Sequence, residues 1–333
     1  MTTKYAIITG GSSGLGLHFA KSLYACGGFS VILGCRNKEK AERAISEFEY
    51  VQIDEQRKSL FRDVKYLQAR WFGLQANMGQ SGSISSQIRQ NQAKFFKKTT
   101  DGLRENPSVI GKFFCDPLIS FIFFKLELTS LESIEKFVDE FADICGANKL
   151  YLLVNNAGIM NHPYALTSSG LEIHFVSNFL GHFYLTNLLL EKDLFADKSR
   201  ILNITSSYYT KCPFIPDDEV LMSPTPMDNR PSNYYYSASK LANCLHVLAL
   251  NEKFRRENKQ IKIVAVRPGF VRGTEGIAGT IHCAMCDFDE LESGSLYYDT
   301  KPIEYDKFSV TNDAADELWN TANRLIAYSK NNP

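Results

Sequence analysis

The stretch that decides the fold is Ile7–Gly16, with the sequence IITGGSSGLG. A short apolar run leads into it, and a helix pattern with Leu15, Phe19 and Leu23 at four-residue spacing follows. Its glycines allow a tight turn, close approach of the backbone to a pyrophosphate, and close packing of helix on strand. The free N–H groups of the helix N-terminus then bind the phosphates. We therefore predict a dinucleotide-binding turn made by Thr9, Gly10, Ser12, Ser13, Gly14, Leu15 and Gly16.

Short β-branched or aromatic runs recur along the rest of the chain, and several are almost continuously apolar, as in strands buried on both faces of a parallel sheet. These runs are Tyr5–Thr9, Phe29–Gly34, Ser120–Leu126, Leu150–Asn155, Arg200–Ile204 and Ile261–Arg267. Helix patterns alternate with them over Gly14–Cys26, Leu131–Ala142, Gly170–Leu190 and Ser237–Phe254. Such alternation indicates βαβ units with right-handed crossovers. The sequence predicts an α/β fold of Rossmann type, a doubly wound parallel sheet with helices on both faces, as a single domain over residues 1–333.

The composition of the 333-residue chain is that of a globular protein, with 44% hydrophobic and 22% charged residues. Lys+Arg and Asp+Glu both total 37, so no net field attracts nucleic acid or an anionic membrane. We expect no membrane span, because the longest apolar candidate, Pro117–Phe124, falls far short of the roughly 20 residues that a bilayer requires. The N-terminus lacks a signal-peptide pattern. The eight scattered cysteines include one isolated CxxC, Cys283–Cys286, and indicate reduced thiols in a cytoplasmic protein without a metal site.

One long stretch interrupts the alternation. From about Tyr50 to Pro117 both hydrophobic periods are lost, and the chain becomes polar and basic, as in Ser83–Thr100. A structureless loop of this length is improbable inside a compact domain. We predict an atypical insertion at 50–117, which is a disordered insertion, a helical excursion, or translated sequence foreign to the folded product. A Pro-rich stretch, Pro213–Pro231, predicts an ordered but irregular surface loop.

The residues after the second predicted strand indicate which dinucleotide binds. A site for NAD usually has Asp or Glu there for the ribose 2′-hydroxyl, whereas a 2′-phosphate requires a cation. This chain has Arg36 there, followed by Lys38 and Lys40. Arg36 can pair bidentately with a phosphate and stack on adenine; the alternative is a solvated surface arginine. We predict NADP(H) as the cofactor, with Arg36 and Lys40 among the residues that bind it.

Tyr236 and Lys240 are the candidates for acid/base chemistry. They are four residues apart on a predicted helix, so their side chains share a face. A cation there favours the phenolate, which brings the tyrosine pKa closer to neutrality. Ser206, at the end of the fifth predicted strand, can hydrogen-bond a substrate oxygen and stabilise developing charge. Tyr234 and Tyr235 are weaker candidates because neither has a lysine four residues later.

These motifs resemble those of the short-chain dehydrogenase/reductase family. Within it the resemblance is to the branch of retinol dehydrogenases, WW-domain oxidoreductase and protochlorophyllide reductase. The segments that carry it are Ile7–Gly16, Val31–Ala44, Leu153–Gly158 (LVNNAG), Asn178–Phe183 (NFLGHF), Tyr236–Asn243 (YSASKLAN) and Val266–Glu275 (VRPGFVRGTE). They cover most of the chain outside the insertion. The resemblance implies about seven parallel strands, the last of them within Ser293–Tyr298.

The resemblance also implies roles for further residues. The residues that border the adenosine are expected to be Asn155, Asn156, Ala157 and Gly158, and Pro268 and Gly269 are expected to border the nicotinamide. Glu127 and Leu128 stand where the family usually has Asp and Leu beside the adenine, and the longer carboxylate can reach it through water. Asn178 joins Ser206, Tyr236 and Lys240 as a catalytic residue with a water-relay role beside Lys240, unless its amide only binds a neighbouring backbone. Tyr236 and Lys240 are also expected to contact the cofactor.

The implied function is that of an NADP(H)-dependent oxidoreductase, which interconverts a carbonyl and an alcohol of a retinoid-like, steroid-like or other lipophilic small molecule by hydride transfer. Tyr236 serves as its acid/base. After Glu275, however, relatives run through a segment that covers the substrate, whereas here a helix pattern starts at about Thr280. Without this lid, selectivity and turnover should decrease. The alternative is therefore a cofactor-binding, catalytically weak scaffold that acts through protein contacts. A homodimer through the helices that carry Asn178 and Tyr236 is also implied.

Overall fold

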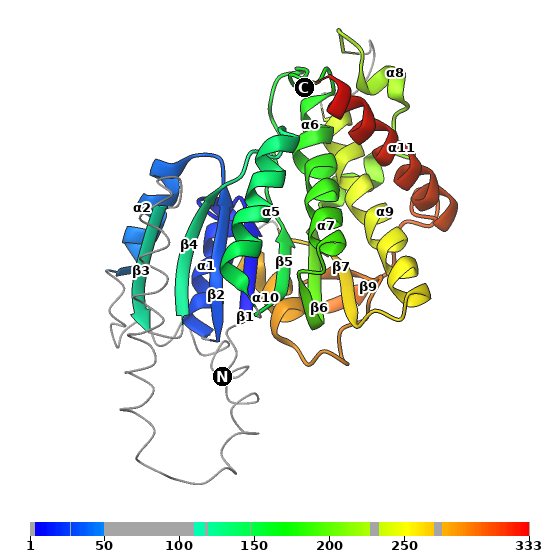
Figure 1. The fold of residues 1–333 in the computed structure, drawn as a ribbon. Helices are drawn as coiled ribbons and strands as arrows, with labels where there is room; N and C mark the ends of the chain where they lie inside the picture. Colours follow the sequence, from blue (N-terminus) through cyan, green and yellow to red (C-terminus); the bar gives the residue numbers. More distant parts are fainter. Residues whose placement is uncertain are drawn as a thin grey trace, which may run out of the picture.

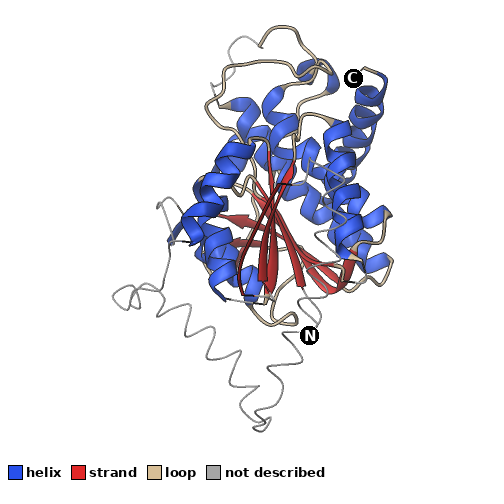
Figure 2. Ribbon diagram, turned by 60° about the vertical axis from the view of Figure 1, so that its left-hand side comes forward, coloured by secondary structure: helices blue, strands red, loops and turns tan. Residues whose placement is uncertain are grey.

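A single sheet forms the centre of the molecule (Figures 1 and 2). The computed structural model describes residues 4–26, 28–49, 110–116, 119–146, 148–226, 233–269 and 275–332. Within these ranges the sheet has nine strands, in the order β3-β4-β2-β1-β5-β6-β7-β8-β9. The strands are β1 Lys4–Thr9, β2 Phe29–Cys35, β3 Ile110–Asp116, β4 Ile119–Lys125, β5 Leu150–Asn155, β6 Phe195–Ile204, β7 Ile261–Arg267, β8 Leu296–Tyr298 and β9 Lys301–Ile303.

The seven strands from β4 to β8 across this order pair in parallel with their neighbours. β3 and β9 pair antiparallel at the two edges. The prediction of a doubly wound α/β fold with about seven parallel strands is therefore confirmed, including its last strand within 293–298. The strand order reverses between β1 and β5, and in such sheets ligands bind outside the carboxyl ends of the strands at this point.

Helices bury both faces of the sheet, which explains why its central strands are almost continuously apolar. On one face lie α1 (Gly14–Cys26), α2 (Lys38–Glu49) and α10 (Ala278–Met285), which contribute to one apolar core. On the other face lie α5 (Leu131–Cys145), α7 (Gly181–Glu191), α9 (Tyr234–Arg256) and α11 (Asn312–Asn331), which contribute to a second core. Figure 2 shows the strands between these two layers. The result is a single α/β domain.

Three helical regions differ from the sequence prediction, of which α2 was not among the predicted helices. The apolar segment Gly170–Leu190 is not one helix but the short α6 (Ile173–Phe175), the π-helix η2 (Val176–Leu180) and α7. An apolar pattern does not reveal the wider π-turn, and such turns occur frequently at functional sites. The C-terminal helix α11 was not predicted, although its buried residues Ala315, Leu318, Ala322 and Leu325 have helical spacing.

The proposed insertion at 50–117 overlaps the sheet at its end. Residues 110–116 form β3, which the loss of hydrophobic period did not reveal. Residues 50–109 and 117 lie outside the described residues. The stretch predicted as a surface loop, 213–231, contains the short helix α8 (Asp218–Leu221), and its residues 227–231 also lie outside the described part.

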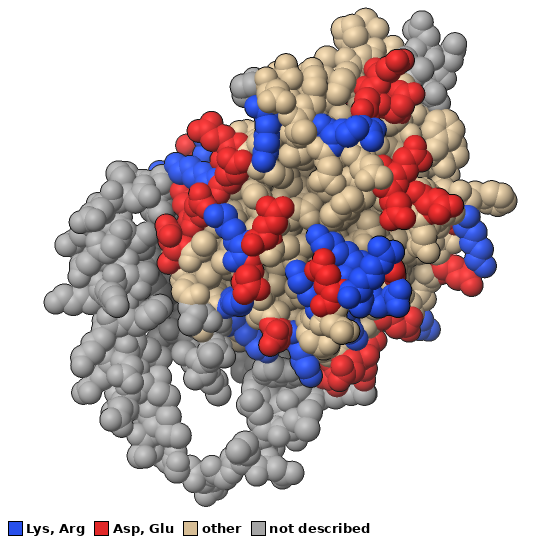
Figure 3. All heavy atoms as spheres, turned by 45° about the vertical axis from the view of Figure 1, so that its right-hand side comes forward, with Lys and Arg blue, Asp and Glu red and all other residues tan. Residues whose placement is uncertain are grey.

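After residues 270–274, which are not among the described residues, the 3-10 helix η4 (Glu275–Ile277) leads directly into α10. The early helix expected after Glu275 is thus confirmed. None of the described helices combines the length and the apolar character needed to cross a membrane. On the face drawn in Figure 3, basic and acidic side chains lie intermingled, as the balanced composition suggests.

Candidate active site

A cavity of about 410 Å³ opens at the carboxyl ends of β5, β6, β7 and β8. The first turns of α1 and α9 and the loops that follow these strands form its walls. Sequence segments that lie far apart in the chain therefore meet here. The predicted site residues that line the cavity are Leu15, Asn156, Gly158, Ser206, Tyr236, Lys240, Pro268 and Gly269.

Lys240 follows Tyr236 by one turn of α9, and only 5% of its surface is exposed. Its Nζ donates a hydrogen bond to the carbonyl oxygen of Ile204 (3.0 Å) and lies 5.7 Å from the centre of the Tyr236 ring. Burial lowers the pKa of Lys240 to about 8. The ammonium group is therefore charged at neutral pH and loses its proton in mildly alkaline solution.

Ser206 brings a hydroxyl group to the Tyr236 phenol. It follows β6 in an extended conformation and caps the 3-10 helix η3 (Ser207–Lys211), where its Oγ accepts a hydrogen bond from the backbone N–H of Tyr208 (3.3 Å). Burial raises the pKa of Tyr236, although its hydrogen bond with Ser206 acts in the opposite direction. The expectation that Lys240 moves this pKa toward neutrality is wrong in this structure, because burial dominates and the ammonium group hydrogen-bonds the Ile204 carbonyl. The phenol is thus protonated at neutral pH.

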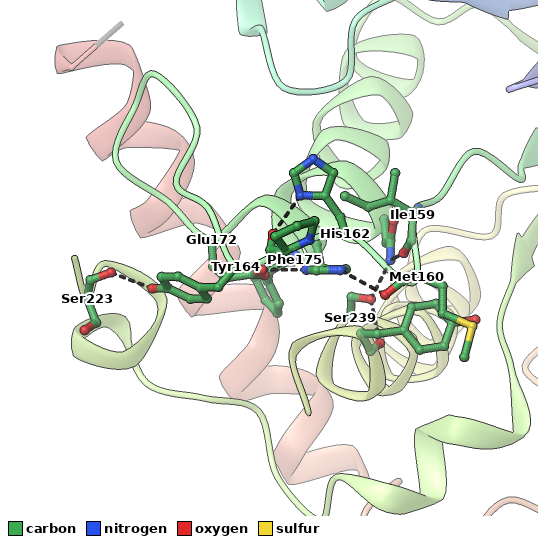
Figure 4. A network of polar contacts seen from close by, with 12 residues as sticks. Ile159, Met160, His162, Tyr164, Glu172, Phe175, Ser223 and Ser239 are labelled. Carbon is green, nitrogen blue, oxygen red and sulfur yellow. Dashed lines mark hydrogen bonds and ion pairs between the residues drawn. The ribbon is translucent and has the colours of Figure 1, made fainter. Parts of the chain in front are cut away.

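Asn178 lies in the π-helix η2 and is fully buried behind the cavity wall. Its Oδ1 accepts a hydrogen bond from the backbone N–H of Ile159 (2.8 Å), while its Nδ2 donates to the Ile159 carbonyl (2.9 Å) and to Ser239 Oγ (2.9 Å) (Figure 4). A Cβ atom on Gly158 would lie 3.1 Å from Asn178 Oδ1 and 3.5 Å from Lys240 Nζ. The amide thus binds a backbone segment, as the alternative interpretation expected, and this segment lies next to Lys240. Its water-relay role stays a prediction.

A fully buried histidine connects Asn178 to the glycine-rich turn. His182 Nδ1 lies 3.0 Å from the carbonyl oxygen of Asn178, and its Nε2 lies 2.8 Å from Thr9 Oγ1. Because a carbonyl can only accept, Nδ1 carries the proton and Nε2 accepts from the Thr9 hydroxyl. Thr9 Oγ1 in turn accepts from the backbone N–H groups of Asn156 and Ala157, both at 2.9 Å. Burial lowers the pKa of His182 to about 4, so this network contains a neutral imidazole.

A second histidine holds the cavity wall, and sequence reasoning missed it. Glu172 is fully buried, and its Oε1 lies 2.7 Å from His174 Nδ1, whereas His174 Nε2 lies 3.1 Å from the carbonyl oxygen of Met160 (Figure 4). Because a carbonyl can only accept, Nε2 donates to it, and the ring is held between Glu172 and the Met160 backbone. Glu172 Oε2 caps the helix by accepting from Phe175 N (2.8 Å). The pattern Glu-x-His just before an apolar helix was the available signal.

The glycine-rich turn packs directly against the loop that follows β5. Gly10 has a φ of +66°, which favours glycine, and a Cβ there would lie 2.9 Å from Ala157 Cα. A Cβ on Gly16 would lie 2.4 Å from Asn156 Nδ2 and 2.6 Å from Gly10 O. No larger residue fits at either position without displacing the loop after β5. The residues present suit a dinucleotide on the outer side of the turn, where a Cβ on Gly14 (φ +55°) would meet nothing within 4 Å.

The residues predicted to bind the 2′-phosphate and the adenine lie beyond the cavity, after β2 and β4. Arg36 is exposed, and its Nε lies 3.6 Å from Glu127 Oε2. Glu127 Oε1 accepts from Thr129 Oγ1 (2.9 Å), and Lys40 is exposed on α2. The carboxylate that departs from the family pattern therefore lies next to the cation that was predicted to choose the cofactor.

The remaining predicted residues lie outside the cavity. Asn155 is buried within the sheet, where its Nδ2 donates to Thr186 Oγ1 (3.2 Å) and Asn203 Oδ1 (2.8 Å), so it links β5 to α7 and β6. Leu128 is buried beneath Gly181 of α7, where a Cβ would lie 2.3 Å from the Leu128 carbonyl oxygen. Seven residues that line the cavity were not among the predicted site residues, namely Ile159, Met160, Ile204, Thr205, Ser207, Arg267 and Tyr298.

The fold and the site together define a Rossmann-type α/β protein with a nucleotide-binding turn beside a Ser–Tyr–Lys cavity. A sequence profile described as short chain dehydrogenase matches residues 114–214. Human retinol dehydrogenase 12 is 32% identical over 228 residues, which cover 61% of this chain and 68% of the relative. Human retinol dehydrogenase 14 is 30% identical over 357 aligned residues, which cover 99% of this chain and 88% of the relative. The chain belongs to the short-chain dehydrogenase/reductase family, in its retinol dehydrogenase branch, and is an oxidoreductase.

Solved structures agree with this fold. A crystal structure of an uncharacterised protein from Mycobacterium paratuberculosis superposes with a TM-score of 0.64 at 23% identity, covering 98% of this chain and 94% of the other. An NADPH-bound carbonyl reductase from chicken fatty liver superposes with a TM-score of 0.53 at 15% identity, covering 92% of this chain and 100% of the other. At these identities the likeness shows the fold alone.

Proposed function

We propose that the protein is an NADP(H)-dependent oxidoreductase that interconverts a carbonyl and an alcohol of a lipophilic small molecule. The observation that carries this proposal is the convergence of Ser206, Tyr236 and Lys240 on one cavity, next to the glycine-rich turn. Apolar side chains such as Ile159 and Met160 line the same cavity and suit a lipophilic substrate. Relatives named retinol dehydrogenase support this substrate class.

The cofactor is proposed from the residues present at the ends of β1, β2 and β5. The turn from Gly10 to Gly16 packs directly on the loop at Asn156 and would hold the pyrophosphate on its open side, where a Cβ on Gly14 would meet nothing within 4 Å. Arg36 would pair with a 2′-phosphate, and among the described residues its exposed guanidinium has one ion-pair partner, Glu127, at 3.6 Å. Pro268 and Gly269 would border the nicotinamide. When bound, the dinucleotide supplies the hydride in reduction and accepts it in oxidation.

The protein's own residues handle the proton. Tyr236, protonated at neutral pH because burial raises its pKa, donates its phenolic proton to the substrate oxygen in reduction and removes that proton in oxidation. Ser206 hydrogen-bonds the same oxygen and stabilises its developing charge. Lys240, charged below about pH 8 and hydrogen-bonded to the Ile204 carbonyl, would hold the nicotinamide ribose. Asn178 holds Ile159 and Gly158 beside Lys240, where it can order a proton-relaying water.

The test is NADPH consumption by the purified protein across a panel of aldehydes and ketones, with the Tyr236→Phe variant beside the wild type. We expect the variant to lose nearly all turnover while its NADPH dissociation constant stays the same, since only the proton donor is removed. Tyr235→Phe, which alters the adjacent buried tyrosine, serves as the matched control and should remain active. A Tyr236→Phe variant that keeps more than about a tenth of the wild-type rate, a loss below about 1.4 kcal/mol, excludes Tyr236 as the acid.

The alternative proposal, a cofactor-binding scaffold with weak catalysis, is favoured by one observation. Helix α10 begins at Ala278, directly after η4, which leaves little chain for a lid over the substrate. Clear NADPH binding without turnover of any carbonyl in the panel would select this alternative. For the compartment we propose the cytoplasm, supported by six described cysteines that all carry free thiols.

A further inference from the structure

An unpartnered arginine lines the active-site cavity. Arg267 is the last residue of β7, and its register partner Tyr298 is the last residue of β8. The guanidinium carbon of Arg267 lies 4.1 Å from the centre of the Tyr298 ring, and both side chains line the cavity that contains Ser206, Tyr236 and Lys240. The two residues therefore form one stacked unit in the cavity wall.

Among the residues that the structure describes, no acidic side chain neutralises this arginine. Its side chain forms neither an ion pair nor a hydrogen bond with any described residue, and no Asp or Glu of the described chain lines the cavity. The charges of Asp306 and Arg267 both affect the pKa of Tyr209, so this carboxylate lies in the same region. It accepts hydrogen bonds from Ser309 Oγ (2.5 Å) and Phe308 N (3.5 Å). Lys240, the other cation in the wall, hydrogen-bonds the Ile204 carbonyl.

Stacking on an aromatic ring fixes the plane of a guanidinium group and leaves its N–H edges free. Those edges match a carboxylate bidentately, and a half-buried cation without a counter-charge is costly until an anion arrives. We propose that the substrate is an amphipathic carbonyl compound or alcohol that carries a carboxylate, which binds Arg267 while its apolar part packs on Ile159 and Met160. This rests on the proposed function and narrows its substrate class.

The position of Arg267 favours the substrate over the cofactor as the source of the anion. Ile204 pairs with Val266, so Arg267 lies one strand spacing, about 5 Å, from the strand that leads into Ser206. The glycine-rich turn follows β1, which is three strands away across β5 and β6, about 14 Å. A carboxylate near the reacting carbonyl of one small molecule is thus better placed to reach Arg267 than the pyrophosphate is.

The experiment compares reduction of 2-, 3- and 4-carboxybenzaldehyde with that of their methyl esters, in wild type and in Arg267→Met. We expect at least one carboxylate isomer to have a KM about tenfold below that of its ester in the wild type. In Arg267→Met this ratio should fall to about one, while kcat for the ester and the NADPH dissociation constant stay within about twofold. Arg267→Lys should keep part of the preference. Arg43→Met, on the exposed side of α2, is the matched control and should behave as wild type.

Equal KM values for acid and ester in the wild type overturn the proposal, as does a preference that persists in Arg267→Met. A large increase in the NADPH dissociation constant of Arg267→Met with an unchanged preference would assign Arg267 to the cofactor instead. If no aldehyde is turned over, the proposed function fails, and calorimetry with benzoate and methyl benzoate in the presence of NADP+ still decides the inference. Benzoate binding that disappears in Arg267→Met supports it, and equal binding of acid and ester, or none of the acid, refutes it.

Discussion

At the residue scale, Arg36 is the side chain that should choose between the two dinucleotides. Its exposed pair with Glu127 contributes little by itself, so the guanidinium is available to a 2′-phosphate. A charge-assisted hydrogen bond is worth about 1.5–3 kcal/mol. We therefore expect Arg36→Ala to raise the NADPH dissociation constant at least about tenfold and to leave that for NADH unchanged, as measured by fluorescence titration.

Lys38→Ala is the control for this experiment, because Lys38 carries the same charge close by but faces Glu42 on α2 (3.9 Å). It should leave both dissociation constants near their wild-type values. If the wild type binds NADPH and NADH with comparable constants, Arg36 does not select the cofactor.

The central site residues could be predicted because their relation is local. A four-residue spacing on a helix brings Tyr236 and Lys240 onto one face, and a strand end presents Ser206 at the edge where ligands bind. Arg267 and Tyr298 could not be paired in this way, since their contact depends on the register between β7 and β8. The direction of the Tyr236 pKa also required the structure, because burial outweighs the effects of its neighbours.

At the element scale, the junction between η2 and α7 should make stability depend on pH. His182 is neutral in the folded protein with a pKa of about 4, whereas an unfolded histidine has its ordinary value near 6.5. Between these values the unfolded chain binds a proton that the folded protein does not, so the free energy of unfolding falls as the pH is lowered from about 6.5 to 4. One such histidine contributes about 1.4 kcal/mol per pH unit in this window.

Denaturant unfolding of the wild type and of His182→Asn at several pH values measures this effect. The variant is expected to be less stable at neutral pH. Its free energy of unfolding should also change less steeply with pH, by about the contribution of one histidine. His246, buried on α9 with a pKa lowered to about 3, and His282, whose pKa is also lowered by burial, should contribute to the slope that remains. Equal slopes for the two proteins would mean that His182 is protonated in the folded state.

The helices and strands were predictable where burial imposes one clear period on the hydrophobic residues of a segment. Strands buried on both faces and helices with one apolar face were found close to their observed limits. The π-helix was not, because the apolar residues from Phe175 to Leu180 fit an ordinary helix equally well. What distinguishes it is the hydrogen bonding of Asn178 and His182 to distant segments, which a local pattern does not contain.

At the scale of the whole molecule, α11 bears on the question of oligomerisation. Trp319 of α11 contacts Phe183 of α7, with ring centres 5.0 Å apart, and His246 of α9, with ring centres 6.3 Å apart. Figure 1 shows α11 lying alongside α9. A homodimer through the helices that carry Asn178 and Tyr236 would need the surface that α11 covers. We therefore expect a monomer in sedimentation experiments at micromolar concentration, and a dimer there would support the pairing that the family resemblance implies.

The strand order also places β3 far from the predicted catalytic residues. Helix α2 and β3 flank residues 50–109, and β3 lies at the edge of the sheet, five strand spacings, or about 24 Å, from β6. An insertion attached at this edge is remote from the strand end that leads into Ser206. A fluorescent tag or an affinity handle spliced between α2 and β3 should therefore leave substrate reduction intact, which makes this edge the natural place to attach the enzyme to a surface or to a reporter.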